Sequence, residues 1–419
     1  MDRSPNKFGI LSLQYFTYPD AVGGAWGLTF EVNKRLVQRG YEVCLVTCSP
    51  SEYFRGREVI EGVQFFRVSS RDSKNIFRLW RALRKRIHAV LDRSSIQTIH
   101  IHNPLVGFLA LMNRRLWPIP KVYHFHSSWY DEEKINQQDQ QPAATLLRLV
   151  FSAKLALRLR LIRFMEWTCY FASRNILFLS EYSRERFLKY YPWKKPRLSV
   201  IPGGVDVREF CPPEGDEEVS ALRRELGFPA DRPILLTVRR LEARMGLENL
   251  VLAAARVVRQ NPDLPFLLLI AGKGPLAPRL EGLIREHQLE DRVRLVGLVP
   301  RNRLPDHYRC ADVFLLPTTF IEGFGLATVE ALACGVPVLG TPVGGTVEIL
   351  SSIDKTLLLR GTEPEDIADG MEGFLKNPQP ILGLKSRCRE AAVSRYSWEL
   401  VVDRLEKEFP GPRPVGDRS

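Results

Sequence analysis

The stretch Pro317-Thr-Thr-Phe-Ile-Glu-Gly-Phe-Gly-Leu-Ala-Thr-Val-Glu-Ala-Leu-Ala-Cys-Gly-Val-Pro-Val338 decides how this chain folds. It follows the apolar run Val313–Leu316, which is typical of a buried strand, and leads through a glycine loop into helix formers at 326–334. Gly335 stands where a helix end favours glycine, and a second apolar run begins at Val336. A strand, a glycine loop, a helix and a strand in this order predict one unit of a parallel sheet covered by helices.

Two carboxylates frame the glycine loop of this unit. Glu322 stands at the mouth of the loop, and Glu330 falls about one turn into the helix. Backbone N–H groups and the positive end of a helix point toward whatever lies over such a loop, which suits phosphate. The ordinary alternative is a strand-to-helix turn with two solvated glutamates. Because both carboxylates frame Gly-Phe-Gly between two buried strands, we favour a ligand site.

Apolar runs of strand type alternate with helix-like segments along all 419 residues. This pattern predicts parallel sheets with helices on both faces, and the length favours two domains over one. The stretch 202–215, rich in Gly and Pro, precedes a charged helix at 217–226 and is typical of a linker. We expect ligands in a cleft between the domains, at the carboxyl ends of the strands. The expected strands are 10–16, 42–48, 63–68, 98–102, 121–126, 175–179 and 199–201, then 234–238, 266–271, 293–296, 313–316, 336–339 and 356–359.

Composition and charge indicate a cytoplasmic protein with an anionic partner. Seven scattered cysteines without a C-x-x-C pair are typical of reduced thiols, and no secretory apolar run precedes the first strand. The net charge of +12 is uneven: up to Gly203 there are 32 Lys and Arg against 16 Asp and Glu, and afterwards 28 against 32. A basic first half favours lipid phosphate, a membrane surface, a polyanionic glycan or nucleic acid as partner. The alternative is a merely solvated surface.

Two segments of the first half raise the question of membrane contact. Segment 146–172 is apolar but carries six charged residues, too many for a membrane span. Its basic residues are scattered around a helical wheel, which also argues against a helix lying on a surface. Ile76–Leu91 separates apolar residues from Arg78, Arg81, Arg84 and Lys85. It is either an interfacial docking face or, as we favour, an ordinary helix that covers a sheet.

Glycines and histidines mark two further candidate sites. Gly23 and Gly24 precede a helix expected at 28–38, where they either let backbone approach a phosphate or form a tight turn. His124 and His126 share one face of a strand, and His126, at its carboxyl end, can donate a hydrogen bond to a sugar hydroxyl or phosphate. The neighbouring strand repeats the pattern with His100 and His102. We expect no metal, because no carboxylate or cysteine shares the histidine spacing.

Three arginines, Arg239, Arg240 and Arg244, follow the strand at 234–238. Arginine forks match the oxygens of a diphosphate, and a leaving diphosphate must have its charge neutralised. The alternative is that these arginines are solvated at a domain edge.

Taken together, these residues resemble the GT-B type retaining nucleotide-sugar glycosyltransferases of family four (glycosyl transferases group 1), over roughly residues 8 to 400. The resemblance implies an α/β fold of two doubly wound Rossmann-like domains with an interdomain cleft. Residues 1–203 would bind the acceptor, together with a crossover helix at about 396–410, and residues 204–395 would bind the donor. The matching landmarks, in family order, are Gly23-Gly24, His126, 180–183, 201–206, Arg240, 272–275, Glu322 through Glu330, and Gly344-Gly345 before Glu348.

The resemblance also implies residue roles. Glu330 would hold the donor ribose, Arg240 would neutralise the diphosphate, and His126 would contact the transferred sugar. Where the family usually has a lysine, this chain has Met245, and Arg244 or Arg239 would take its place. We expect His126, Glu322 and Arg240 at the reacting centre, and donor contacts from Gly23, Gly24, Arg239, Arg244, Gly323, Phe324, Gly325, Leu326 and Glu330.

The expected activity is transfer of a hexose from a nucleoside diphosphate sugar to an acceptor hydroxyl, with retained configuration and neither metal nor cofactor. Combined with the basic first half, it predicts an anionic or lipid-linked glycan acceptor in polysaccharide or glycolipid assembly. The protein would then be cytoplasmic, in peripheral contact with the inner face of the membrane, and would bind no nucleic acid. The alternatives are glycosylation of a soluble small molecule or natural product, nucleotide-sugar 2-epimerisation, and a non-catalytic anion-binding protein.

Overall fold

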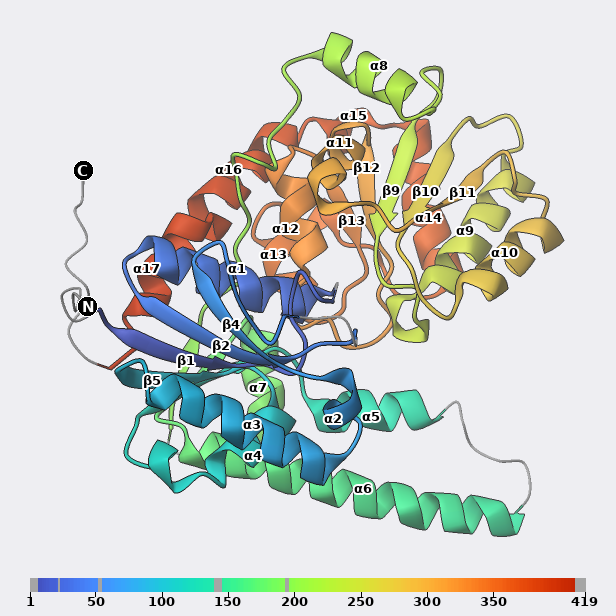
Figure 1. The fold of residues 1–419 in the computed structure, drawn as a ribbon. Coiled ribbons are helices and arrows are strands. Elements are labelled where there is room, and N and C mark those ends of the chain that lie inside the picture. The colour runs from blue at the N-terminus through green and yellow to red at the C-terminus, as the bar shows by residue number, and fades with distance from the viewer. Residues whose placement is uncertain (1–6, 22, 52–54, 139–144, 193–195, 411–419) are drawn as a thin grey trace. The chain divides into compact units, whose positions relative to one another are not determined.

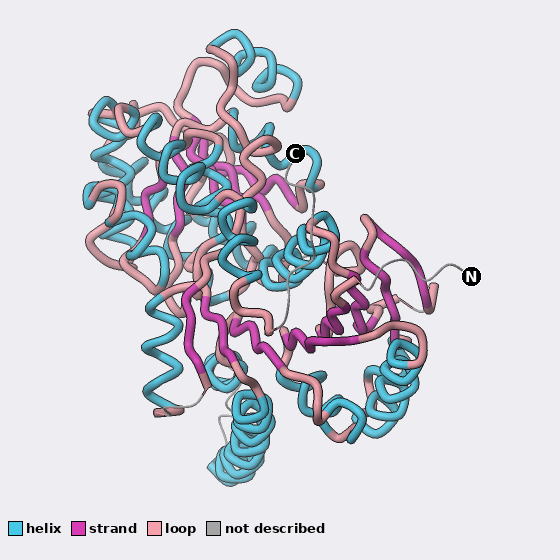
Figure 2. Tube along the Cα trace, turned by 90° about the vertical axis from the view of Figure 1, so that its left-hand side faces the viewer, coloured by secondary structure: helices cyan, strands magenta, loops and turns pink. Residues whose placement is uncertain are grey.

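A computed structural model describes residues 7–21, 23–51, 55–138, 145–192 and 196–410. The chain forms two compact units (Figure 1). One runs to Ile201 and takes up the chain again from Val402, and the other is Pro202–Val401. Each unit has a mainly parallel sheet whose strand order requires crossovers, so the predicted α/β class with two doubly wound domains is confirmed. Figure 2 traces the strands of both sheets.

The first unit contains an eight-stranded sheet in the order β3-β4-β2-β1-β5-β6-β7-β8. Neighbouring strands are parallel except β3 and β4, which pair in antiparallel register. The sequence did not indicate β3, because its residues alternate between exposed and half-buried and form no apolar run. The strands are β1 (Gly9–Leu13), β2 (Glu42–Cys48), β3 (Arg57–Ile60), β4 (Val63–Val68), β5 (Ile96–Ile101), β6 (Lys121–Phe125), β7 (Asn175–Phe178) and β8 (Arg197–Val200).

Helices cover both faces of this sheet, with α1 on one face and α3, α4 and α6 on the other (Figure 1). Leu79, Leu83 and Ile87 of α3 are buried in the core cluster, which confirms that this segment covers the sheet. Its basic side is exposed, so covering the sheet does not exclude contact with a partner on that side. The helices are α1 (Gly24–Gln38), α2 (Ser70–Ser73), α3 (Ile76–Leu91), α4 (Pro104–Leu111), η1 (Arg114–Leu116), α5 (Trp129–Gln138), α6 (Thr145–Ala172) and α7 (Glu181–Tyr190).

The second unit contains a five-stranded parallel sheet in the order β11-β10-β9-β12-β13. Its last strand begins later than predicted, because the Val336 N–H bonds to Ala331 O and Pro337 has no N–H to give. The predicted strand at 356–359 is wrong: Asp354 caps a 3-10 turn there, and only Leu358 bridges to Gly340. The strands are β9 (Ile234–Val238), β10 (Leu267–Ala271), β11 (Val293–Gly297), β12 (Val313–Leu316) and β13 (Val338–Gly340).

Helices connect these strands and close the chain. The last helix, α17 (Trp398–Glu406), begins in the second unit, where the Trp398 ring packs on Gly204, and the chain rejoins the first unit at Val402. The remaining helices are α8 (Asp216–Glu225), η2 (Ala243–Met245), α9 (Leu247–Gln260), α10 (Ala277–Glu286), η3 (Arg301–Arg303), α11 (Leu304–Arg309), α12 (Leu326–Ala333), α13 (Gly345–Ser351), η4 (Lys355–Leu357), α14 (Pro364–Lys376), α15 (Gln379–Leu382) and α16 (Lys385–Tyr396).

Candidate functional site

The loop between β12 and α12 is the centre of the candidate site in the second unit. Gly325 has a φ of 93°, which favours glycine, and it stands at the N-cap of α12 without a side-chain cap. The first turn of α12 carries no acidic residue. Gly345 N–H bonds to Glu322 O over 2.8 Å, and a side chain at Gly344 would collide with the Glu322 backbone. The glycines therefore hold the loop close to α13 and leave an electropositive helix end suited to phosphate.

Glu322 forms an ion pair inside this loop. Arg239 Nη2 lies 2.5 Å from Glu322 Oε2, and both side chains are close to buried, at 7% and 12% exposure. Thr318 Oγ1 donates to the same carboxylate over 3.2 Å and accepts from Arg239 over 2.8 Å. Burial opposes ionisation, but the Arg239 charge outweighs it, so the pKa of Glu322 lies below its ordinary value. The carboxylate is therefore ionised and fixed in direction.

Glu330 is oriented by a residue that the sequence did not reveal. Tyr308, on α11, donates its hydroxyl to Glu330 Oε2 over 2.9 Å. The tyrosine is fully buried, and burial together with the nearby carboxylate raises its pKa well above 10.0, so it stays a neutral donor. No spacing or motif links these two residues along the chain, since only folding brings α11 against α12.

The arginines after β9 have different partners. Arg239 Nη2 also lies 3.0 Å from Met245 Sδ. The Met245 side chain, which stands where the resemblance led us to expect lysine, is 5% exposed and packs against this arginine. Arg244 donates from Nη1 to Ile321 O over 3.0 Å, at the start of the same loop. Arg240 pairs instead with Glu242 over 3.0 Å and is 41% exposed. Arg239, Arg244 and Glu322 thus come together around one loop.

In the first unit, four histidines gather at the ends of β5 and β6. His126 Nε2 lies 3.1 Å from His102 Nδ1, and the His124 and His126 rings stack 4.8 Å apart at 7°. Burial lowers the pKa of all four, that of His124 to about 4, so the cluster is neutral at pH 7. His126 is the half-buried member, at the carboxyl end of β6 as the sequence predicts.

The histidine cluster fits a metal poorly. His100, His102 and His124 offer ring nitrogens that all lie within 4.8 Å of one another. A tetrahedral zinc with bonds of about 2.0–2.1 Å brings its ligand atoms to within roughly 3.4 Å. The His124 ring stacks on those of His100 and His102, at 20° and 27°, whereas His100 and His102 are tilted against each other by 46°. Stacked rings turn their faces, not their in-plane lone pairs, toward one another. The cluster is therefore built as a stack of neutral rings.

The two glycines of the first unit stand where α1 begins. Gly23 precedes the helix and Gly24 is its first residue, four residues before the helix start expected from the sequence. The first turn has neither an acidic residue nor a side-chain cap, and a side chain at Gly23 would press on the Trp26 ring. Open N–H groups at this helix end suit an anion.

Comparisons with known proteins agree with this architecture. Residues 22–209 match the family model described as Glycosyltransferase Family 4, and residues 218–395 match that of Glycosyl transferases group 1. A D-inositol 3-phosphate glycosyltransferase of Kribbella flavida is 27% identical over 96% of this chain and 95% of its own. A GDP-mannose-dependent alpha-(1-6)-phosphatidylinositol monomannoside mannosyltransferase of Mycolicibacterium smegmatis is 29% identical over 57% of this chain and 62% of its own.

Solved structures share the fold. Sucrose-phosphate synthase from Thermosynechococcus elongatus superposes with a TM-score of 0.79 at 23% identity, covering 96% of this chain and 98% of that one. The Anabaena protein HepE, solved in complex with UDP and glucose, superposes with a TM-score of 0.71 at 18% identity, covering 96% and 98%.

Proposed function

We propose a reaction for this chain from the premise that it belongs to the glycosyltransferases. Its first half matches Glycosyltransferase Family 4, and its second half matches Glycosyl transferases group 1. The reaction is transfer of a hexose from a nucleoside diphosphate sugar to an acceptor hydroxyl, with retention of the anomeric configuration and without a metal. Residues 204–395 bind the donor. Residues 1–203, with the returning helix at about 396–410, bind the acceptor.

The observation that carries this proposal is the loop between β12 and α12 with its framing side chains. Glu330, oriented by Tyr308, accepts hydrogen bonds from the donor ribose hydroxyls. Glu322, with the backbone of Gly323, Phe324, Gly325 and Leu326, holds the donor sugar and phosphates. The uncapped N-terminus of α12 lies in the same loop and offers N–H groups to the anionic part of the donor.

Cationic side chains take the place of a metal at the leaving diphosphate. Arg244 and Arg240 carry this role, with Arg239 held back by its ion pair with Glu322. Met245, buried against Arg239, leaves Arg244 as the substitute for the family lysine. In the first unit, Gly23 and Gly24 receive phosphate at the open N-terminus of α1.

Neutral His126 supports the transferred sugar by a hydrogen bond. A neutral imidazole offers one donor and one acceptor and adds no charge beside the forming oxocarbenium centre. The leaving phosphate itself accepts the acceptor's proton, so this mechanism needs no protein nucleophile.

The donor site is tested by thermal shift with UDP-, GDP- and ADP-sugars, followed by product analysis with the best stabiliser. The Glu330→Ala variant loses the donor-induced shift, whereas an exposed control, Glu290→Ala, retains it. The NMR coupling constant of the anomeric proton in the product shows whether the configuration is retained. Undiminished turnover in the presence of a chelator shows that the reaction needs no metal. A full donor shift in Glu330→Ala means that the site lies elsewhere.

The acceptor is anionic and lipid-linked, at the inner face of the membrane. Support comes from the excess of Lys and Arg up to Gly203. Two relatives are named for phosphate-bearing acceptors, one a phosphatidylinositol glycolipid and one an inositol phosphate. The relative named for inositol phosphate favours a soluble anionic small molecule as the second candidate for the acceptor. Partition of the radiolabelled product between butanol and water separates the two.

A further inference from the structure

The outer side of the long helix α6 carries a row of large apolar side chains that are exposed. Of the large hydrophobic side chains in the described residues that are exposed, five lie on this helix. They are Leu157 (69% exposed), Leu161 (51%), Phe164 (54%), Trp167 (42%) and Phe171 (71%). Their spacing of three or four residues keeps them on one side of the helix, and they extend over about 21 Å at 1.5 Å per residue. We call this set the α6 stripe.

The opposite side of α6 already has a packing role. Ile162, Met165, Cys169 and Tyr170 are buried against the sheet and its neighbours. The α6 stripe is therefore distinct from the side of the helix that packs in the core. Within the stripe, Trp167 stacks on Phe171 at 5.2 Å, which makes a flat aromatic surface toward solvent.

Charge around the α6 stripe has one sign. Lys154, Arg158 and Arg160 are exposed beside it, whereas Glu166, the one acidic residue in 145–172, is buried. Arg158 pairs with Glu133, but within the described part of the chain no acidic partner is found for Lys154 or Arg160. An apolar stripe with flanking cations and no carboxylate matches the boundary of an anionic lipid layer.

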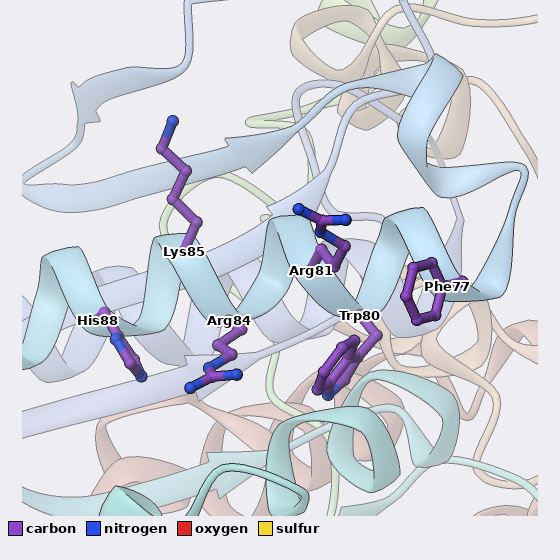
Figure 3. Close-up of a pocket in the computed structure, with 6 residues that line it drawn as sticks. All are labelled: Phe77, Trp80, Arg81, Arg84, Lys85 and His88. Atoms are coloured by element: carbon purple, nitrogen blue, oxygen red, sulfur yellow. The ribbon is translucent and has the colours of Figure 1, made fainter.

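The neighbouring helices continue this surface. α3, α4 and α6 cover the same face of the sheet (Figure 1). Phe108 of α4 packs edge-on against Phe164 of the stripe. Met112 and Trp117, just after α4, are 55% and 61% exposed. On α3, a shallow groove of ≈ 480 Å³ is lined by aromatic and basic side chains (Figure 3): Phe77, Trp80, Arg81, Arg84, Lys85 and His88.

We propose that the outer surface of α6, continued by α4 and α3, docks this protein on an anionic lipid membrane. The α6 stripe enters the boundary between headgroups and acyl chains, while Lys154, Arg160 and the α3 cations meet lipid phosphates. This inference rests on the proposed function, since docking on a membrane would bring the enzyme to a lipid-linked acceptor. It concerns the surface alone, since within the described residues no helix has the length and apolarity of a span.

A second copy of the chain fits this surface less well. A two-fold dimer through the α6 stripe would bring the cationic flanks of two copies together, and the one acidic residue in 145–172, Glu166, is buried and cannot balance them. Anionic lipid supplies that balance at every position along the helix. Charge complementarity therefore selects the lipid surface.

The test is co-sedimentation of the full chain with vesicles of phosphatidylglycerol and of phosphatidylcholine alone, at low and high salt. The unmodified protein binds phosphatidylglycerol vesicles, and salt weakens the binding. A charge variant, Lys154→Glu with Arg160→Glu, and an apolar variant, Leu157→Ser with Phe171→Ser, each lose at least tenfold in partition coefficient. Two controls change exposed residues elsewhere. The double variant Arg285→Glu with Lys355→Glu is the control for charge, and Val59→Ser is the control for the apolar substitutions. Both should bind as the unmodified protein does.

Other outcomes overturn the docking. If the charge variant binds phosphatidylglycerol vesicles as strongly as the unmodified protein does, the α6 stripe does not dock on anionic lipid. If light scattering shows a dimer of the unmodified protein and monomers of both variants, the α6 stripe binds a second copy of the chain. The donor-induced thermal shift separates this inference from the proposed function: docking variants keep that shift, and Glu330→Ala loses it while still binding vesicles. Lost docking with an intact donor shift leaves the proposed donor site standing.

Discussion

Tyr308 donates its buried hydroxyl to Glu330 Oε2 over 2.9 Å, so a side chain from α11 sets the direction of the carboxylate on α12. The two residues are 22 positions apart. At the proposed donor site this carboxylate would therefore be oriented in advance, so ordering it would cost no binding energy.

The Tyr308→Phe variant is expected to weaken donor binding roughly tenfold, because a hydrogen bond to a charged group contributes about 1.5 kcal/mol or more. Titration calorimetry with the best-stabilising donor measures the loss. Tyr190→Phe is the matched control, since it removes a 3.0 Å bond from a tyrosine to Asp131 in the first unit. Equal donor affinity in both variants would show that Tyr308 does not position Glu330 for the donor.

Breaking the Arg239–Glu322 pair is expected to destabilise the second unit. Arg239→Met leaves a nearly buried carboxylate without its cation and should lower the free energy of unfolding by about 3 kcal/mol. A double variant, Arg239→Met with Glu322→Leu, should recover much of that loss, since no buried charge remains. Urea unfolding of the three proteins measures it, and a double variant as unstable as the single one would contradict the explanation.

The same pair predicts a pH dependence. Because the pKa of Glu322 in the folded protein lies below its ordinary value of 4.5, its contribution to stability is present above pH 4.5. It is lost as the pH falls through the lower, folded value. The difference in unfolding free energy between the unmodified protein and Glu322→Gln, followed from neutral to acid pH, should therefore shrink on acidification.

Glu166 predicts the opposite trend. Burial against α5 raises the pKa of this carboxyl to about 7, despite the hydrogen bonds that it accepts from the Trp129 N–H and the Tyr191 hydroxyl. The folded state then holds a proton that the unfolded state releases above its ordinary value of 4.5. Stability should fall by roughly 3 kcal/mol between pH 4.5 and 7 and level off above that. The Glu166→Gln variant should lack this slope in urea titrations across the range.

Replacing Met245 with lysine, the residue that the family resemblance led us to expect at this position, should harm the protein. The Met245 side chain is 5% exposed and its sulfur contacts Arg239, so a lysine would bring a second cation onto that guanidinium. We expect a loss of about 1–3 kcal/mol in stability and no gain in donor affinity. Met245→Leu should be nearly neutral. A tighter donor complex in Met245→Lys would show that Arg244 does not replace the family lysine.

The position of strands was predictable wherever burial left a continuous apolar run. β2, β4, β9 and β12 have the bounds that the sequence predicted. β3 was missed because an edge strand exposes alternate residues, and the segment 356–359 formed no strand because Asp354 caps a turn. The scattered basic residues of segment 146–172 argued against a helix lying on a surface, and our docking proposal for α6 departs from that expectation. The wheel alone did not show which side of the helix would be free of the core.

By itself, the sequence determined the α/β class, the glycine loop and the helix on which Glu322 and Glu330 stand, because local backbone preferences and apolar periodicity act over neighbouring residues. Only the tertiary structure decided that Arg239 pairs with Glu322, that Tyr308 orients Glu330 and that the α6 stripe faces solvent. Each of these depends on which side chains from distant segments fill the same space. Packing against other elements decides that, and no local pattern records it.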